Sequence, residues 1–168
     1  WDYSDTTFTL YDKPPAPTIT DPEADETGVA INPTLTGSDY PASGYSTQTS
    51  SDWKIYKDVG LTQLCWSKTG YTGNPMTSIV VNATNGTFDG TNCNGMTALT
   101  ASTQYWAQVQ YNNGAGPSGY GAATHFTTVA VPSAPIAPDT ITVDTIDKTT
   151  YTVHWLDRSS DEEKFRVY

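Results

Sequence analysis

Residues 99–128, LTASTQYWAQVQYNNGAGPSGYGAATHFTT, decide the fold of this chain. Between Tyr105 and Tyr111, apolar side chains at the odd positions alternate with Trp and Gln at the even ones. This two-residue period is that of a β-strand with one buried face. The Asn and Gly residues of 112–119 tolerate positive φ, so the chain can reverse there and return through 125–128. We therefore predict two antiparallel strands joined by a glycine-rich hairpin.

The composition favours an all-β protein. The 168-residue chain holds 11 Tyr, 5 Trp and 13 Gly, and only 15% of its residues are charged. Aromatic residues are enriched in strands, whereas a helical protein would contain more Ala, Leu, Glu and Lys. The net charge of -10 argues against a nucleic-acid partner, because phosphate is bound largely by Lys and Arg. No run approaches the roughly 20 apolar residues of a membrane span, so none is predicted.

The same stretch resembles fibronectin type III modules and the related bacterial immunoglobulin-like modules. Leu99, Ala101, Thr103 and Tyr105 stand at alternate positions where such modules carry Leu, a small residue or Pro, Thr and Tyr, and Phe-Thr-Thr closes the stretch at 126–128. The resemblance implies an all-β sandwich of about seven strands in two packed sheets. It also implies that Tyr105 is the tyrosine-corner residue, whose hydroxyl bonds an upstream backbone group. Proline is common at the position of Ala101, a mild departure.

A short pattern occurs twice along the chain. Residues 8–17 match residues 126–135 without a gap, at an offset of 126 minus 8, or 118 residues, and both run from Phe-Thr to Pro-x-Ala-Pro. A strand end followed by a proline joint at one period is expected of modules in an array. We therefore predict the last strand of an upstream module over 1–13, one complete module over 14–128 and the first strands of another over 129–168.

The complete module should have strands besides the hairpin, and a buried aromatic core. Trp53, Tyr105 and Val109 are the core residues that the alternation predicts. An acidic turn is expected at 21–28. The other expected strands are 18–20, 29–35, 52–58, 61–67 and 78–82.

Residues 129–168 resemble the start of a further fibronectin type III module. Strands are expected around 141–143, 151–155 and 165–167, with Trp155 in the core on the second of them. Three strands cannot bury the inner face of a sandwich, and a bare edge invites pairing with another chain. We therefore expect either a segment of a longer protein or a module completed by strands of a neighbour.

Cys65 and Cys93 are the only cysteines. In an acidic, Thr-rich β-protein we predict that they form one disulfide, with two free thiols as the alternative. A closed loop of 93 minus 65, or 28 residues, should stabilise the module by about 3 kcal/mol. Two glycosylation sequons, Asn82-Ala-Thr and Asn85-Gly-Thr, lie between the cysteines, although such triplets also arise by chance in Thr-rich sequence.

Three further features have a functional and a structural interpretation. The carboxylates of 21–26 could bind calcium, but their spacing lacks the EF-hand glycine and distal glutamate, which favours a solvated turn. Residues 114–119 match GxGxxG, but no helix is expected after them, so we assign them to the hairpin. Trp66 alternates out of phase with Cys65, so we expect Trp66, together with Tyr71, at an interface or against a glycan. The alternative is that these rings pack on neighbouring strands or under loops.

These patterns favour a non-enzymatic protein without a cofactor or metal. The chain has no GxSxG or HExxH motif, and neither His125 nor His154 has a sequence neighbour that suggests catalysis. The resemblance implies a structural segment of an extracellular filament or cell-surface array, whose partners are neighbouring copies or modules. The alternative is a carbohydrate-binding or spacer region of a secreted glycan-degrading enzyme or phage tail protein.

Overall fold

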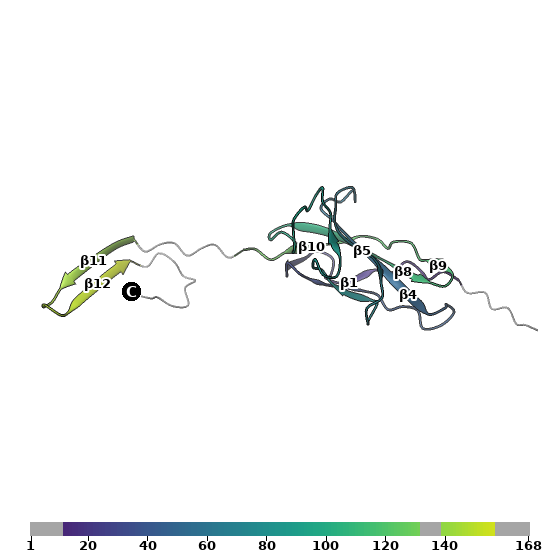
Figure 1. Ribbon diagram of the computed structural model, residues 1–168, viewed down its shortest axis with the longest axis horizontal. Coiled ribbons are helices and arrows are strands. Elements are labelled where there is room, and N and C mark those ends of the chain that lie inside the picture. The colour runs from purple at the N-terminus through teal and green to yellow at the C-terminus, as the bar shows by residue number, and fades with distance from the viewer. Residues whose placement is uncertain (1–11, 132–138, 157–168) are drawn as a thin grey trace, which may run out of the picture. The chain divides into compact units, whose positions relative to one another are not determined.

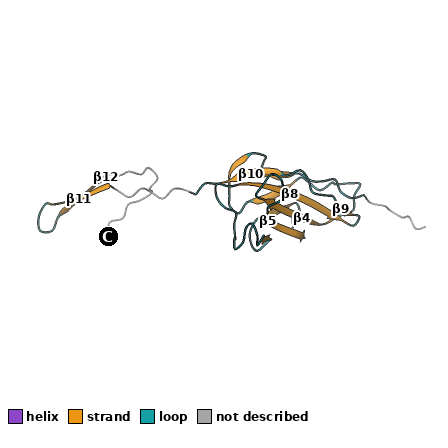
Figure 2. Ribbon diagram, turned by 90° about the horizontal axis from the view of Figure 1, so that it is seen from above, coloured by secondary structure: helices purple, strands orange, loops and turns teal. Residues whose placement is uncertain are grey.

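The computed structural model describes residues 12–131 and 139–156, and the chain separates into two compact units, Trp1–Ala130 and Val131–Tyr168. Every regular element in the described residues is a β-strand (Figures 1 and 2). The strands of the first unit are β1 (Ile19–Asp21), β2 (Glu26–Val29), β3 (Thr34–Gly37), β4 (Gln48–Tyr56), β5 (Leu64–Tyr71), β6 (Ser78–Val80), β7 (Thr87–Phe88), β8 (Gln104–Asn113), β9 (Gly116–Pro117) and β10 (Thr124–Thr128). The second unit has β11 (Asp139–Thr145) and β12 (Tyr151–Leu156). No helix with the length and apolarity to cross a membrane occurs among the described residues.

The first unit is a sandwich of two sheets. The smaller sheet has the order β1-β3-β6, and the larger one has the order β2-β10-β8-β4-β5-β7, with β9 paired to β8. Neighbouring strands are antiparallel except β2 and β10, which run parallel. The chain changes sheets at several points, for example between β1 and β2 and between β5 and β6. The chain therefore crosses repeatedly between two layers, as in immunoglobulin-like sandwiches.

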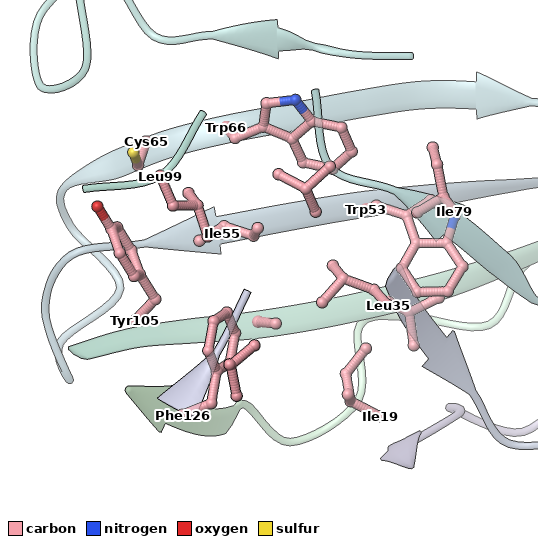
Figure 3. Packing of buried hydrophobic residues seen from close by; sticks show 14 of the residues in the cluster. Ile19, Leu35, Trp53, Ile55, Cys65, Trp66, Ile79, Leu99, Tyr105 and Phe126 are labelled. Atoms are coloured by element: carbon pink, nitrogen blue, oxygen red, sulfur yellow. The ribbon is translucent and has the colours of Figure 1, made fainter. Parts of the chain in front are cut away.

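The core fills the space between the two sheets. Leu35 and Ile79 of the smaller sheet lie against Trp53 of the larger sheet (Figure 3). Trp53, Tyr105 and Val109, the core residues named from the sequence for the complete module, are all fully buried. Trp155 lies in β12, and its side chain is outside the part that the structure describes. The period-two pattern of β8 places Tyr105, Ala107, Val109 and Tyr111 on its inner face.

The tyrosine corner predicted from the resemblance is present. The backbone N–H of Thr100 donates a hydrogen bond to the Tyr105 hydroxyl at 3.0 Å. Thr128 closes the same corner from β10, since its Oγ1 donates to the carbonyl of Thr100 at 2.6 Å and accepts from the N–H of Thr103 at 3.0 Å. The corner therefore ties the loop before β8 to the last strand of the sandwich.

The segment 29–35 is not the single strand that the sequence predicts. β2 begins earlier, inside the expected acidic turn, and pairs with β10 of the larger sheet, whereas β3 belongs to the smaller sheet. The chain changes sheets between them at residues 30–33, where Pro33 is buried and has no N–H for a ladder. β10, the strand with which β2 pairs, lies about a hundred residues away in sequence. No local sequence pattern therefore indicates this pairing.

The described part of the second unit is an antiparallel hairpin. Val143 pairs with Val153 and Thr145 with Tyr151. Val143 and Ile146 expose more than half of their surface. The two strands expected around 141–143 and 151–155 are therefore present, while the strand expected around 165–167 lies outside the described residues, as do 1–11 and the second proline joint.

Candidate functional site

The predicted disulfide is confirmed. Cys65 and Cys93 are joined with a Cα–Cα distance of 5.1 Å, which links β5 to the loop between β7 and β8. Asp89 organises this loop, because its carboxylate accepts hydrogen bonds from the N–H groups of Thr91 and Asn92, each at 2.9 Å. Both cysteines are buried, so they support structure rather than present a reactive thiol.

The expectation that Trp66 lies at an exposed interface or glycan contact is wrong. Trp66 is fully buried, and its indole Nε1 donates to the carbonyl of Asn82 at 3.0 Å (Figure 3). The cause is a register shift. Ile55 pairs with Trp66 and Tyr56 pairs with Leu64, which leaves Cys65 as an extra residue in β5. An extra residue interrupts the alternation of faces, so the consecutive residues Cys65 and Trp66 are both buried.

Tyr71 stands at the end of β5, opposite Ser51 of β4. It is half-buried and packs against the core cluster, with its ring close to Gly73. An aromatic ring held in this way offers only part of its surface, so Tyr71 as a contact for a partner or glycan remains a prediction.

The two sequons lie in the turn between β6 and β7. The Asn82 side-chain oxygen accepts hydrogen bonds from the N–H groups of Thr84 at 2.9 Å and Asn85 at 2.8 Å. The side-chain nitrogen of Asn85, which would carry a glycan, donates to the carbonyl of Val80 at 2.9 Å. Glycosylation of Asn82 and Asn85 remains a prediction.

The acidic turn is held by its own hydrogen bonds. Glu26 accepts from the N–H of Glu23 at 2.8 Å through its carboxylate, and the Asp25 carboxylate contacts His125 Nε2. In the described ranges 12–131 and 139–156, no group of three or more His, Cys, Asp or Glu side chains is placed to hold a metal ion. The other two carboxylates of this segment, those of Asp21 and Glu23, belong to exposed residues. The turn therefore uses its acids to shape the approach to β2.

The GxGxxG match belongs to a hairpin, as predicted. β9 pairs back onto the end of β8 through Asn112–Pro117 and Asn113–Gly116. Gly116 has a φ of 122° and Gly119 a φ of 87°, values that favour glycine. The strand β10 follows, so these amides are not presented at a helix N-terminus.

A row of ring side chains crosses the outer face of the larger sheet. We call Tyr56, Trp106 and His125 the aromatic row. Tyr56 of β4 is the register partner of Trp106 on β8, and Trp106 is the partner of His125 on β10. The rings of Trp106 and His125 are nearly parallel, with centroids 6.1 Å apart and an angle of 27° between planes. All three residues are half-buried, so each ring keeps part of its surface at the solvent.

One end of the aromatic row is anchored by Asp25. Its carboxylate pairs with His125 Nε2, and its backbone N–H donates to the His125 carbonyl at 2.9 Å. Asp25 adopts a φ of 66°, which an Asp side chain tolerates better than most. The carboxylate contact holds the imidazole beside the Trp106 ring, and the backbone hydrogen bond holds Asp25 next to β10.

Polar side chains border the row on the same face. Lys54 and Gln108 are register partners, and the Lys54 ammonium lies 4.4 Å from the centre of the Tyr120 ring. Gln108 donates to the carbonyl of Gly121 at 2.8 Å, which leaves its amide oxygen as an acceptor. Burial raises the pKa of the Tyr120 hydroxyl, although Lys54 opposes that shift. The hydroxyl therefore stays protonated at neutral pH and can donate a hydrogen bond.

The sequence alone did not predict the aromatic row, although the position of Trp106 in β8 indicated part of it. Trp106 is out of phase with the buried residues of β8, which assigns it to the outer face. Its neighbours Tyr56 and His125 are 50 and 19 residues away in sequence, and only the strand register brings them beside it.

Comparison with known proteins finds similar chains among solved structures. No protein-family model and no curated protein matches this chain. Among solved structures, the chicken CNTN1 FN1-FN3 domains are 16% identical over 85% of this chain, with a TM-score of 0.46, and the chain spans 42% of that chain. The sixth fibronectin type III domain of human fibronectin type III domain containing protein 3 is 14% identical over 79% of this chain and 98% of that chain, with a TM-score of 0.43.

The fold itself is established by the molecule's own geometry. The sheet orders β1-β3-β6 and β2-β10-β8-β4-β5-β7 and the Thr100–Tyr105 corner are the arrangement expected of an immunoglobulin-like sandwich. The described part of the first unit is therefore an all-β sandwich of the fibronectin type III-like kind.

Proposed function

We propose that this chain is a non-catalytic structural segment of an extracellular filament or cell-surface repeat array, in which β-sandwich modules meet through strand contacts. One observation carries the proposal. The sandwich forms hydrogen bonds with the segment that precedes β1 and with the segment that follows β10. Such contacts at both ends are expected of a module within an array.

The leading segment is bonded to the body of the sandwich. The side chain of Asn113, which is buried at the end of β8, donates to the carbonyl of Asp12 at 3.1 Å and to the Tyr40 hydroxyl at 3.0 Å. Asp12 also forms a β-bridge with Tyr45. Pro14 and Pro17 are buried, and proline has little backbone freedom to lose on docking.

The trailing segment is held in the same manner. The N–H of Val129 donates to the carbonyl of Val29 at 2.7 Å, and the carbonyl of Val129 accepts from Ser102 at 3.0 Å. A pull along the chain would therefore load hydrogen bonds of the sandwich before it straightened a free linker. The buried disulfide would limit how far the sandwich extends, and it is typical of proteins in oxidising compartments, which supports an extracellular location.

The residues that could have served catalysis have structural roles instead. The two cysteines form the disulfide, and the glycines of 114–119 form a hairpin. These assignments support a non-catalytic role.

Single-molecule pulling tests the role as a tether. The 168-residue chain, attached at both ends, should give a discrete unfolding peak for the sandwich, and the extension released should increase after reduction because the loop from Cys65 to Cys93 is freed. Extension without a resolved peak would argue against a mechanical role.

Sedimentation velocity tests assembly through strands. In the described residues β11 and β12 pair only with each other, and Val143 is 56% exposed on β11. Sheets with open edges associate with other strands, and a lysine on an edge strand prevents it. We expect association that rises with concentration and is reduced by Val143→Lys, but not by Val59→Lys on a loop of the first unit, where the side chain is 77% exposed. A folded chain that stays monomeric at every concentration would contradict assembly.

The alternative, a carbohydrate-binding region, is favoured by one specific observation, the aromatic row.

A further inference from the structure

We propose that the aromatic row of Tyr56, Trp106 and His125 is a binding platform for an uncharged polysaccharide chain. This goes beyond the structural role, because a tether needs no ligand, and each proposal can fail without the other.

The row has the shape that a linear glycan requires. Its three residues come from the adjacent strands β4, β8 and β10, and Leu64 of β5 extends the line beside Tyr56. Since neighbouring strands lie about 4.8 Å apart, the line from Leu64 to His125 is about 14 Å long. The line runs across the strands on the outer face of the sheet. A polysaccharide could therefore lie along the row and extend beyond both of its ends.

The chemistry of the face suits sugars. Aromatic rings such as those of Trp and Tyr combine a large apolar surface with a polar group, and they can cover the apolar faces of sugar rings. Sugar hydroxyls need both donors and acceptors beside those rings. The Tyr56 and Tyr120 hydroxyls and the amides of Gln108 and Gln110 supply both kinds of group on the same face.

The ionic groups near the row are occupied within the protein. His125 pairs with Asp25, Lys54 lies over the ring of Tyr120, and Asp52 accepts a hydrogen bond from the N–H of Gly70 at 2.7 Å. A charged ligand would compete with these contacts. The chain's net charge of -10 further disfavours an acidic polymer, so the platform fits a neutral glycan.

The row is also preorganised. Asp25 holds His125 by two contacts, and the imidazole lies against the Trp106 ring. Rings that are already held in place lose little freedom when a ligand binds.

A protein partner fits this face less well. Pairing with a strand would use a sheet edge, β2 or β7, whereas Tyr56 and Trp106 lie on the central strands β4 and β8. None of the large aliphatic side chains exposed in the described part of the first unit belongs to the row, so the row does not continue into the wider apolar patch found at the centre of many protein interfaces. These side chains are Ile31, Val59, Val80 and Val129.

Affinity electrophoresis of the 168-residue chain tests the proposal. The gels contain soluble hydroxyethyl cellulose, xylan, galactomannan, laminarin or pullulan, all neutral or nearly so. We expect retardation by at least one of them. Trp106→Ala should weaken binding about tenfold or more, and Tyr56→Ala should also weaken it, whereas Trp106→Phe should retain part of it.

Tyr45→Ala is the matched control, because it removes a half-buried tyrosine from the loop between β3 and β4, outside the aromatic row. It should leave retardation unchanged, and near-ultraviolet circular dichroism should show every variant folded. The proposal is overturned if no polysaccharide of the panel retards the parent chain, or if a folded Trp106→Ala chain is retarded as strongly as the parent. Self-association that depends on Trp106, without retardation, would assign the face to contacts between copies instead.

Discussion

The backbone carbonyl of Pro17 lies directly against Gly121, so closely that no Cβ would fit on that glycine. Gly121 is buried, and its own N–H donates to the carbonyl of Val109 at 3.1 Å. The leading segment thus reaches β8 through a contact that only glycine permits.

Gly121→Ala should therefore destabilise the sandwich by about 1 to 3 kcal/mol, the usual cost of overpacking. Urea unfolding of the parent and the variant measures this difference. Gly90→Ala is the control, because a Cβ there meets no atom within 4 Å, and it should leave stability nearly unchanged. Equal stability of the parent and Gly121→Ala would show that the leading segment is not docked.

Tyr105→Phe should lower the free energy of unfolding by about 1 to 2 kcal/mol. It removes the acceptor of the Thr100 N–H while keeping the buried ring, and it leaves that donor without its partner. Thermal and urea unfolding measure the loss. Tyr45→Phe removes a hydroxyl from a half-buried loop residue and should change stability by no more than about 0.5 kcal/mol. A loss at Tyr105 no greater than at Tyr45 would exclude an energetic role for the corner.

Opening the disulfide should cost about 3 kcal/mol, because it releases a loop of 28 residues in the unfolded state. Urea unfolding with and without reductant measures the effect in the parent chain. The double variant with Cys65→Ala and Cys93→Ala should be destabilised at least as much, and reductant should not change it. If reductant leaves the free energy of unfolding of the parent chain unchanged, the disulfide does not stabilise the sandwich.

Stability should fall at alkaline pH through Tyr111. Burial, and then the charge of Asp39, raises the pKa of this hydroxyl far above its usual value, and it donates to the carbonyl of Ser38 at 2.7 Å. The stabilisation is complete below the unfolded-state pKa of about 10, and it declines as pH rises above that value because only the unfolded chain then loses the proton.

Unfolding measured at several pH values, with tyrosinate absorbance, tests this direction. Tyr111→Phe should be less stable than the parent at neutral pH, since the bond to Ser38 is lost, but its stability should fall less steeply above pH of about 10. An equally steep fall in both proteins would assign the alkaline transition to other groups.

The sequence by itself determined the features that depend on local chain geometry. The alternation from Tyr105 to Tyr111 predicted β8 and its inner face, because a strand turns successive side chains to opposite sides whatever surrounds it. The glycine-rich hairpin followed from backbone preference, and the Tyr105 corner from a motif short enough to read along the chain. The two cysteines, being the only pair, formed the predicted disulfide.

Only the tertiary structure decided the features that depend on which strands meet and in what register. The extra residue at Cys65 turned Trp66 into the core, and the edge of β10 drew Glu26–Val29 into the larger sheet. The same pairing assembled Tyr56, Trp106 and His125 into one row from three distant segments. Strand register is chosen by the burial of whole sheet faces, which is a property of the assembled sandwich and not of any single stretch of sequence.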